Sequence, residues 1–149
     1  MNGASFEPPE DGVDDAPPPG FVRSTFRGPF TTWNGPFYHR VDPDGFAHGF
    51  RARPRHCNGH GIVHGGLLTA VLDGVLAAAV WRETRRRMVT IRLTSDFLAM
   101  ARPGDWVEGT AHVTRAAREI AFAEGRIHVE GRDVLTGSGV FKLMRARRE

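Results

Sequence analysis

Asp73 is the only ionisable side chain between His64 and Arg82, inside a stretch that is otherwise apolar or small. A carboxylate in apolar surroundings must be compensated, because a buried unpaired charge is costly. Asp73 can therefore cap a neighbouring element, pair with an arginine, or act as a nucleophile or general base, and the pattern alone favours the structural and the catalytic roles about equally.

A glycine-rich segment, GHGIVHGG over residues 59–66, lies directly before this apolar stretch. The first N–H groups of a helix have no partner within the helix, and glycine leaves them accessible. Such N–H groups can stabilise an oxyanion or a polarised carbonyl. The alternative interpretation is a structural loop with tight turns. The chemical role is favoured because Asp73 follows nearby in the sequence.

The separation of these two features decides how they can cooperate. Gly65 and Asp73 are eight positions apart, which is about 12 Å along one helix. One substrate carbonyl cannot contact both. If two copies of the helix run antiparallel about a twofold axis, each Asp73 approaches the Gly65 of the other chain, and two equivalent composite sites result.

The elements that must position these groups follow from hydrophobic periodicity. Apolar residues recur at helical spacing from Leu67 to Val80, which predicts one long enclosed helix. Turn residues 42–45 predict a hairpin of roughly 36–41 and 46–53 in an aromatic-rich N-terminal segment. After the helix, Ile91, Leu93, Phe97 and Ala99 alternate as one face of a strand. Three further strands are expected at about 106–114, 119–130 and 134–144. The order predicts an α+β fold, a curved antiparallel sheet packed on one helix.

Composition places the chain among folded single-domain proteins. Of 149 residues, 40% are hydrophobic and 25% charged. Residues 1–20 are rich in proline and acids, so we expect a flexible tail, followed by one domain over 21–149. Five acids precede residue 16, which leaves 12 acids against 20 bases in the remainder, a formal charge of +8. This favours anionic partners such as phosphate-bearing cofactors, although plain solubilising charge is at least as good an explanation.

Location and partners are predicted from what the sequence lacks. A single cysteine, Cys57, and an N-terminus without a signal-like apolar run indicate a cytoplasmic protein. The apolar stretch is short for a membrane span and carries an acid, so no membrane partner is expected. Neither a helix-turn-helix pattern nor an RNA-recognition aromatic motif is evident, so no nucleic acid is expected.

Asn58, His64-Gly65-Gly66 and Leu72-Asp73, at N-x5-HGG-x6-D spacing, resemble the signature of hotdog-fold thioesterases. The likeness runs from about residue 46 to 144 and is greatest to phenylacetate-pathway thioesterases and mammalian thioesterase superfamily members. It implies a hotdog fold and an acyl-CoA thioesterase that needs no separate cofactor, CoA being part of the substrate. A homodimer, and beyond it a dimer of dimers, is expected.

The same resemblance assigns roles to five residues. Asp73 takes the place of the family's nucleophile or general base, and the Gly65 amide that of the group polarising the thioester carbonyl. Asn58 is expected to assist at the carbonyl, and Thr90, early in the following strand, to orient water or support the carboxylate. His64 matches the motif histidine and is expected to be structural or supporting.

Other assignments rest on weaker patterns. Basic side chains at Arg92, Arg115, Arg118 and Arg126 are candidates for the CoA phosphates, although for any one of them a solvated surface arginine is the simpler interpretation. Cys57 with neighbouring histidines fits no standard zinc spacing, so no metal is expected. The main alternative to an enzyme is a non-catalytic hotdog protein that binds acyl-CoA as a ligand sensor. Retention of Asp73, Asn58 and Gly65 favours the enzyme.

Overall fold

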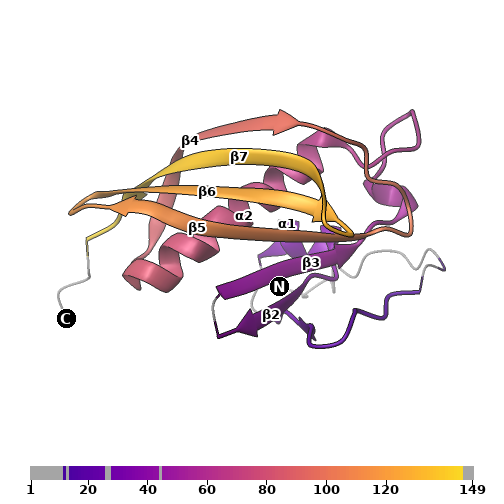
Figure 1. The fold of residues 1–149 in the computed structure, drawn as a ribbon, viewed down its shortest axis with the longest axis horizontal. Helices are drawn as coiled ribbons and strands as arrows, with labels where there is room; N and C mark the ends of the chain where they lie inside the picture. Colours follow the sequence, from indigo (N-terminus) through magenta and orange to yellow (C-terminus); the bar gives the residue numbers. More distant parts are fainter. Residues whose placement is uncertain (1–11, 13, 26–27, 44, 146–149) are drawn as a thin grey trace, which may run out of the picture.

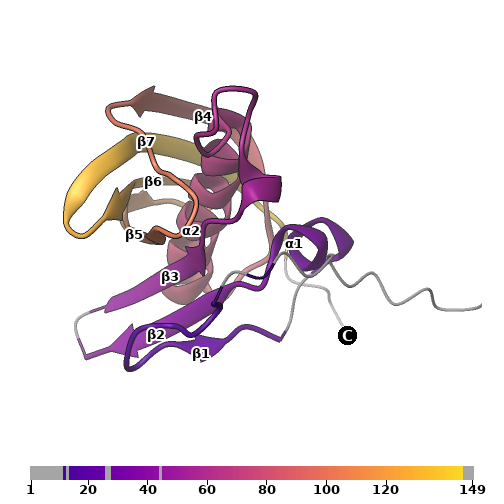
Figure 2. The same cartoon turned by 90° about the vertical axis from the view of Figure 1, so that its right-hand side faces the viewer.

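The computed structural model describes residues 12, 14–25, 28–43 and 45–145. Seven antiparallel strands form one sheet in the order β1-β2-β3-β5-β6-β7-β4, and the sheet curves around a long helix, α2 (Figures 1 and 2). The predicted α+β architecture is confirmed. The elements are β1 (Val22–Arg23), α1 (Pro29–Asn34), β2 (Tyr38–Asp42), β3 (Gly45–Arg51), a 3-10 turn (Pro54–His56), α2 (Gly65–Thr84), β4 (Met88–Phe97), β5 (Trp106–Ala116), β6 (Ile120–Val129) and β7 (Arg132–Leu143).

Helix α2 fills the concave side of the sheet with one face. Its buried side chains are Leu68, Val71, Leu72, Val75, Leu76, Ala79 and Val80. All of these except Ala79 pack in one core with strand residues that include Ile127, Leu135 and Phe141, which are fully buried. By length and hydropathy α2 could also cross a membrane, but here it is the core helix of the fold.

The opposite face of α2 is only partly covered by its own chain. Asp73, Gly74, Ala77 and Ala78 are half-buried, and Trp81 is 49% exposed. The expectation that the helix is enclosed on all sides is therefore wrong for the single chain. Small residues on this face leave a shallow surface that a second element can approach closely.

Glycines in the sheet allow α2 to lie close to it. A Cβ atom at Gly109 would lie 2.7 Å from Val75 Cγ2, and one at Gly137 would lie 2.6 Å from Leu72 Cδ2. Real Cβ contacts of this length do not occur. These strand glycines allow α2 to pack directly on the sheet. This packing fixes the positions of the residues on the open face of α2.

Strand β4 forms one edge of the sheet and pairs only with β7. A β-bulge lies between Thr90 and Arg92, where Thr90 pairs with Phe141 and Arg92 with Val140. A bulge adds one residue to a strand and reverses the faces of the side chains on either side of it. The expectation that Ile91 shares a face with Leu93 is therefore wrong: Leu93 packs on the core, whereas Ile91 is 57% exposed.

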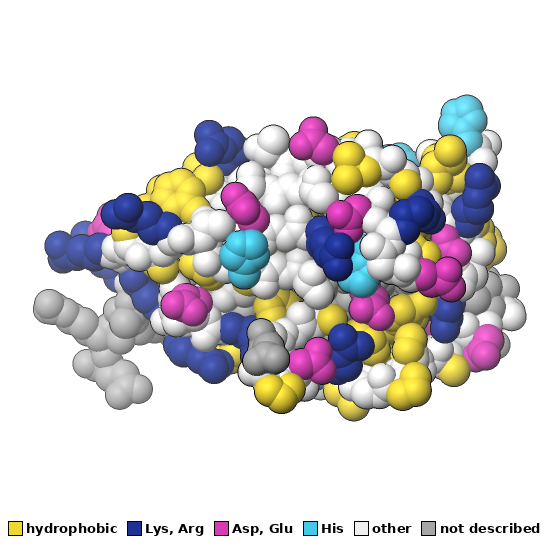
Figure 3. Space-filling view, viewed as in Figure 1, with side chains coloured by type: hydrophobic (Ala, Val, Ile, Leu, Met, Phe, Trp, Pro, Cys, Tyr) yellow, Lys and Arg dark blue, Asp and Glu magenta, His cyan; other side chains and the backbone are white. Residues whose placement is uncertain are grey.

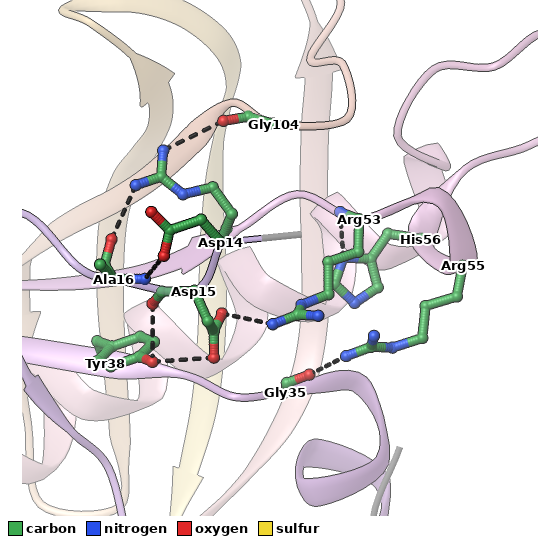
Figure 4. Close-up of polar contacts among 10 residues, drawn as sticks. Asp14, Asp15, Ala16, Gly35, Tyr38, Arg53, Arg55, His56 and Gly104 are labelled. Carbon is green, nitrogen blue, oxygen red and sulfur yellow. Dashed lines mark hydrogen bonds and ion pairs between the residues drawn. The ribbon is translucent and has the colours of Figure 1, made fainter. Parts of the chain in front are cut away.

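The N-terminal segment is held against the sheet (Figure 4). The Tyr38 hydroxyl donates a hydrogen bond to the backbone oxygen of Asp15 over 3.0 Å, and the buried Arg53 guanidinium pairs with the Asp15 carboxylate at 2.8 Å. Burial, and then the Asp15 carboxylate, raise the pKa of Tyr38. Most of the predicted tail, 1–20, lies outside the described residues, and the 1–20 and 21–149 division remains a prediction. The described stretch 14–20 is anchored through Asp15.

Candidate active site

Asp73 lies in the middle of α2, on its open face, and is held by a residue of β4. The Thr90 hydroxyl donates a hydrogen bond to Asp73 Oδ1 over 2.7 Å. The bulge makes this contact possible, because with strict alternation from the inward-facing Leu93 the Thr90 side chain would point away from α2. A hydroxyl at this distance fixes the carboxylate's orientation and leaves its second oxygen available.

The start of α2 exposes one backbone N–H group. His64 is the N-cap, and its Nδ1 accepts a hydrogen bond from the Gly66 N–H over 2.8 Å. The N–H groups of Leu67 and Leu68 donate to the His64 carbonyl oxygen. Within the described ranges the Gly65 N–H has no hydrogen-bond partner. His64 thus occupies the neighbouring donors, and the helix presents the Gly65 amide to a ligand.

Asn58 lies beside this helix start. Its backbone N–H donates to the Ile62 carbonyl, and its side-chain oxygen accepts from the His60 N–H over 2.9 Å. These bonds build the turn before α2. The Asn58 side-chain amide nitrogen has no partner in the part of the chain that the structure describes. Asn58 and Gly65 line the same hollow of about 400 Å³, so the structure brings these two predicted residues together.

Asp73 lies in a different hollow, of about 220 Å³, between α2, α1 and the β2–β3 hairpin. Apart from Asp73, its lining is mainly apolar or aromatic: Phe30, Thr31, Phe37, His48, Leu67, Ala70, Val71 and Gly74. One chain therefore carries the predicted site in two parts: Asp73 with Thr90, and Gly65 with Asn58 and His64. The eight-residue offset between Gly65 and Asp73 separates them by about 12 Å along α2.

Helix α1 and His48 belong to this site and were not predicted from the sequence. Six residues of the aromatic N-terminal segment, Pro29–Asn34, form a helix, and its Phe30 and Thr31 line the same hollow as Asp73. The Arg55 guanidinium donates a hydrogen bond to the Gly35 carbonyl directly after α1, as Figure 4 shows. This bond ties α1 to the loop that leads into α2.

The four arginines proposed for CoA phosphates are all exposed, but they do not form one group in the chain. Arg126 lies in β6 and pairs with Asp133 at 2.8 Å. It borders a hollow of about 600 Å³ on the outer face of the sheet, where acidic, basic and histidine side chains are mixed (Figure 3). Arg115 and Arg118 flank the β5–β6 turn, and Arg92 follows the bulge in β4. Their role in binding remains a prediction.

Cys57 has the environment of a structural cysteine. Burial raises the pKa of its thiol, and the thiol lies 3.5 Å from the Arg53 carbonyl oxygen, to which it donates. A raised pKa disfavours the nucleophilic thiolate at neutral pH. Among the described residues no three histidine, cysteine, aspartate or glutamate side chains converge as a metal site. The chemistry available here is that of Asp73.

Comparisons with known proteins identify the family and the fold of this chain. A family model described as the thioesterase superfamily matches residues 60–136. A Pseudomonas aeruginosa protein named "Putative esterase PA0474" is 39% identical over 129 residues, which cover 85% of this chain and 96% of that protein.

Solved structures share the fold at lower identity. A Bacillus halodurans protein crystallised with CoA gives a TM-score of 0.67 at 22% identity over 73% of this chain and 74% of its own. The Escherichia coli PaaI protein of the phenylacetic acid degradation operon gives 0.64 at 22% over 68% and 73%. Zebrafish thioesterase superfamily member 2 gives 0.67 at 20% over 72% and 81%. At these identities the likeness establishes the fold.

Proposed function

Because this chain belongs to the thioesterase superfamily, a family of ester and thioester hydrolases with the hotdog fold, we propose that it hydrolyses an acyl-CoA to the free acid and CoA. The sequence resemblance is confirmed at the level of family and fold. A CoA substrate is supported by the same fold having been crystallised with CoA. The proposal adds the reaction and the residues that carry it.

The observation that carries the proposal is Asp73, fixed by Thr90 and lining an apolar hollow. An acyl group fits apolar walls, and a thioester carbonyl at the end of that group would then lie within reach of the carboxylate. Asp73 either attacks the carbonyl carbon, forming an anhydride that water later cleaves, or removes a proton from an attacking water. In both routes the bond from carbon to sulfur breaks and CoA leaves as the thiol.

The oxyanion that forms during either route needs a hydrogen-bond donor. The Gly65 N–H is the donor without a partner, and the Asn58 amide nitrogen lies in the same hollow. A preorganised N–H at a helix start is worth far more to a developing negative charge than to the neutral carbonyl, which is the condition for catalysis.

We place the complete site between two copies of the chain. Gly65, Thr69 and Asp73 follow one another at four-residue spacing along one face of α2, and none of them is buried in the single chain. Two such faces packed antiparallel, with the twofold axis near Thr69, bring each Asp73 to the other chain's Gly65.

The edge of the sheet supports this dimer. Strand β4 is paired on one side only, and Val89, Ile91 and Phe97 on it are more than half exposed. Unpaired edges with exposed apolar residues favour pairing with another strand. A second copy would cover both β4 and the open face of α2.

Replacement of Asp73 by Asn tests the proposal. The variant keeps the size and the hydrogen bond from Thr90 but loses the nucleophile and base, so release of free thiol from acyl-CoA should fall roughly 10²- to 10⁴-fold. Glu124→Gln is the control, because Glu124 is an exposed carboxylate on β6, on the outer face of the sheet and away from both α2 and β4. Full activity of Asp73→Asn would overturn the mechanism. If the native protein binds acyl-CoA but releases no thiol, the chain is the ligand sensor instead.

A further inference from the structure

We infer that the hollow beside Asp73 binds a compact acyl group, an aromatic ring or an aliphatic chain of about eight carbon atoms, and that His48 sets the length limit. This inference rests on the proposed function and names its substrate class. It follows from two neighbouring hollows along α2 and from the one side chain that separates them.

The first hollow has a volume of about 220 Å³ and includes Asp73 in its wall. An apolar protein cavity of about 150 Å³ holds a benzene ring. At roughly 30 Å³ for each group the size of a water molecule, the hollow takes seven or eight carbon atoms of an acyl group. Its size therefore fits a benzoyl or phenylacetyl group, or a hexanoyl to octanoyl chain.

The walls of this hollow favour a flat or unbranched group. Phe30 of α1 and Phe37 ahead of β2 lie opposite the small α2 residues Ala70 and Gly74. The Phe37 ring is fixed by the fully buried Phe50, with ring centroids 5.4 Å apart. Aromatic side chains hold other rings by edge and face contacts, so an aryl ring is favoured beyond what volume alone requires.

A second hollow, of about 150 Å³, continues along the same helix. Ala78 and Trp81 of α2 form part of it, one helical turn and more beyond Gly74. Its other lining residues are His39, Val41, Phe46, His48 and Arg82. The second hollow is therefore apolar enough to take an acyl chain, but it lies farther from Asp73.

His48 lines both hollows and is the only residue that they share. Its ring packs edge-on against Phe46, with centroids 5.3 Å apart. This contact holds the imidazole between the two hollows, where the ring closes the end of the hollow that contains Asp73. Removing the ring should join the two hollows.

The matched control is the histidine directly across the hairpin. His39 pairs with His48 in the β2–β3 register, and it lines only the second hollow. A His39→Ala substitution makes the same chemical change one strand away, without opening the boundary.

The experiment measures kcat/KM for straight-chain acyl-CoAs from acetyl to dodecanoyl and for benzoyl-CoA and phenylacetyl-CoA. The native protein should prefer the aryl and hexanoyl to octanoyl substrates and decline beyond them. His48→Ala should move the optimum to decanoyl or dodecanoyl, gaining about fourfold for each added methylene that becomes buried. His48→Phe should keep the native limit or shorten it, and His39→Ala should leave the profile unchanged.

Binding of the same series to Asp73→Asn, measured by calorimetry, separates this inference from the proposed function. If no thioester is hydrolysed but affinity peaks at the compact acyl groups and shifts with His48→Ala, the proposed function fails and the pocket stands. A native preference for dodecanoyl, or a profile in His48→Ala that is the same as in the native protein, would overturn the role of His48.

Discussion

Thr90 is the residue whose contact with Asp73 has the clearest consequence for catalysis. Its hydroxyl donates to Asp73 Oδ1 over 2.7 Å, and hydrogen bonds to charged groups contribute about 1.5–3 kcal/mol. Thr90→Val keeps the shape but loses this bond, so kcat should fall roughly 10- to 100-fold. Thr90→Ser, which retains the hydroxyl, should keep most of the activity. Equal kcat values for the two variants, measured on one acyl-CoA, would show that the bond does not orient the carboxylate.

Single residues of the site differ in how well the sequence predicts them. Asp73 is conspicuous as the lone charge in an apolar segment, and Gly65 as part of a glycine-rich helix start. Thr90 could be proposed only from the family resemblance, because 17 positions and a bulge separate it from Asp73. His48 carries no sequence signal, since its role depends on the distance between a strand and a helix.

At the scale of elements, the start of α2 allows the Gly65 N–H to be removed with the helix retained. Proline is well tolerated at the first helical position, where it lacks only the N–H that has no intrahelical partner. Gly65→Pro should therefore lower kcat roughly 10²- to 10³-fold through loss of the oxyanion donor.

Gly65→Ala is the control for added bulk. Its Cβ would meet the Phe97 ring at 3.0 Å, but that side chain is 56% exposed and can shift. Circular dichroism should show the same helix content in both variants. If Gly65→Ala and Gly65→Pro lose activity equally, the steric change explains the loss and the N–H does not.

Elements with strong periodicity are predicted closely, and those set by tertiary contacts are not. The expected helix and the later strands agree with α2 and β4 to β7 within a few residues. Helix α1 was missed because six residues give no periodic signal and none of its residues is buried. The β4 bulge was missed because alternation assumes an unbroken ladder.

The whole molecule can be tested by mixing two inactive chains. In the composite dimer, a chain carrying Asp73→Asn and a chain carrying Gly65→Pro form one site with both defects and one intact site. With random assortment, about a quarter of native activity should return on co-expression. Recovery should depend on subunit exchange, so mixing the separately purified dimers without exchange serves as the control. No recovery in proven mixed dimers would place Asp73 and Gly65 in one chain.

The proposed dimer follows from a distance rather than from a motif. In the proposed mechanism a second copy is needed because Gly65 and Asp73 are too far apart in one chain, and the open face of α2 and the edge of β4 are the surfaces that such a copy would occupy. The close packing of α2 on the sheet could not be predicted from the sequence, because it depends on strand glycines whose role appears only once Leu72 and Val75 are placed against them.

The bulge in β4 makes the proposed activity depend on the register of this strand. The extra residue between Thr90 and Arg92 determines on which face of the sheet the side chains before the bulge lie. Loss of one residue there would turn the Thr90 hydroxyl outward, together with Met88, which packs at the edge of the core, and the Asp73 carboxylate would lose its hydrogen bond. Deletion of a single codon could thus convert a hydrolase of this fold into a protein that binds acyl-CoA without hydrolysing it. Every proposed site residue would still be encoded.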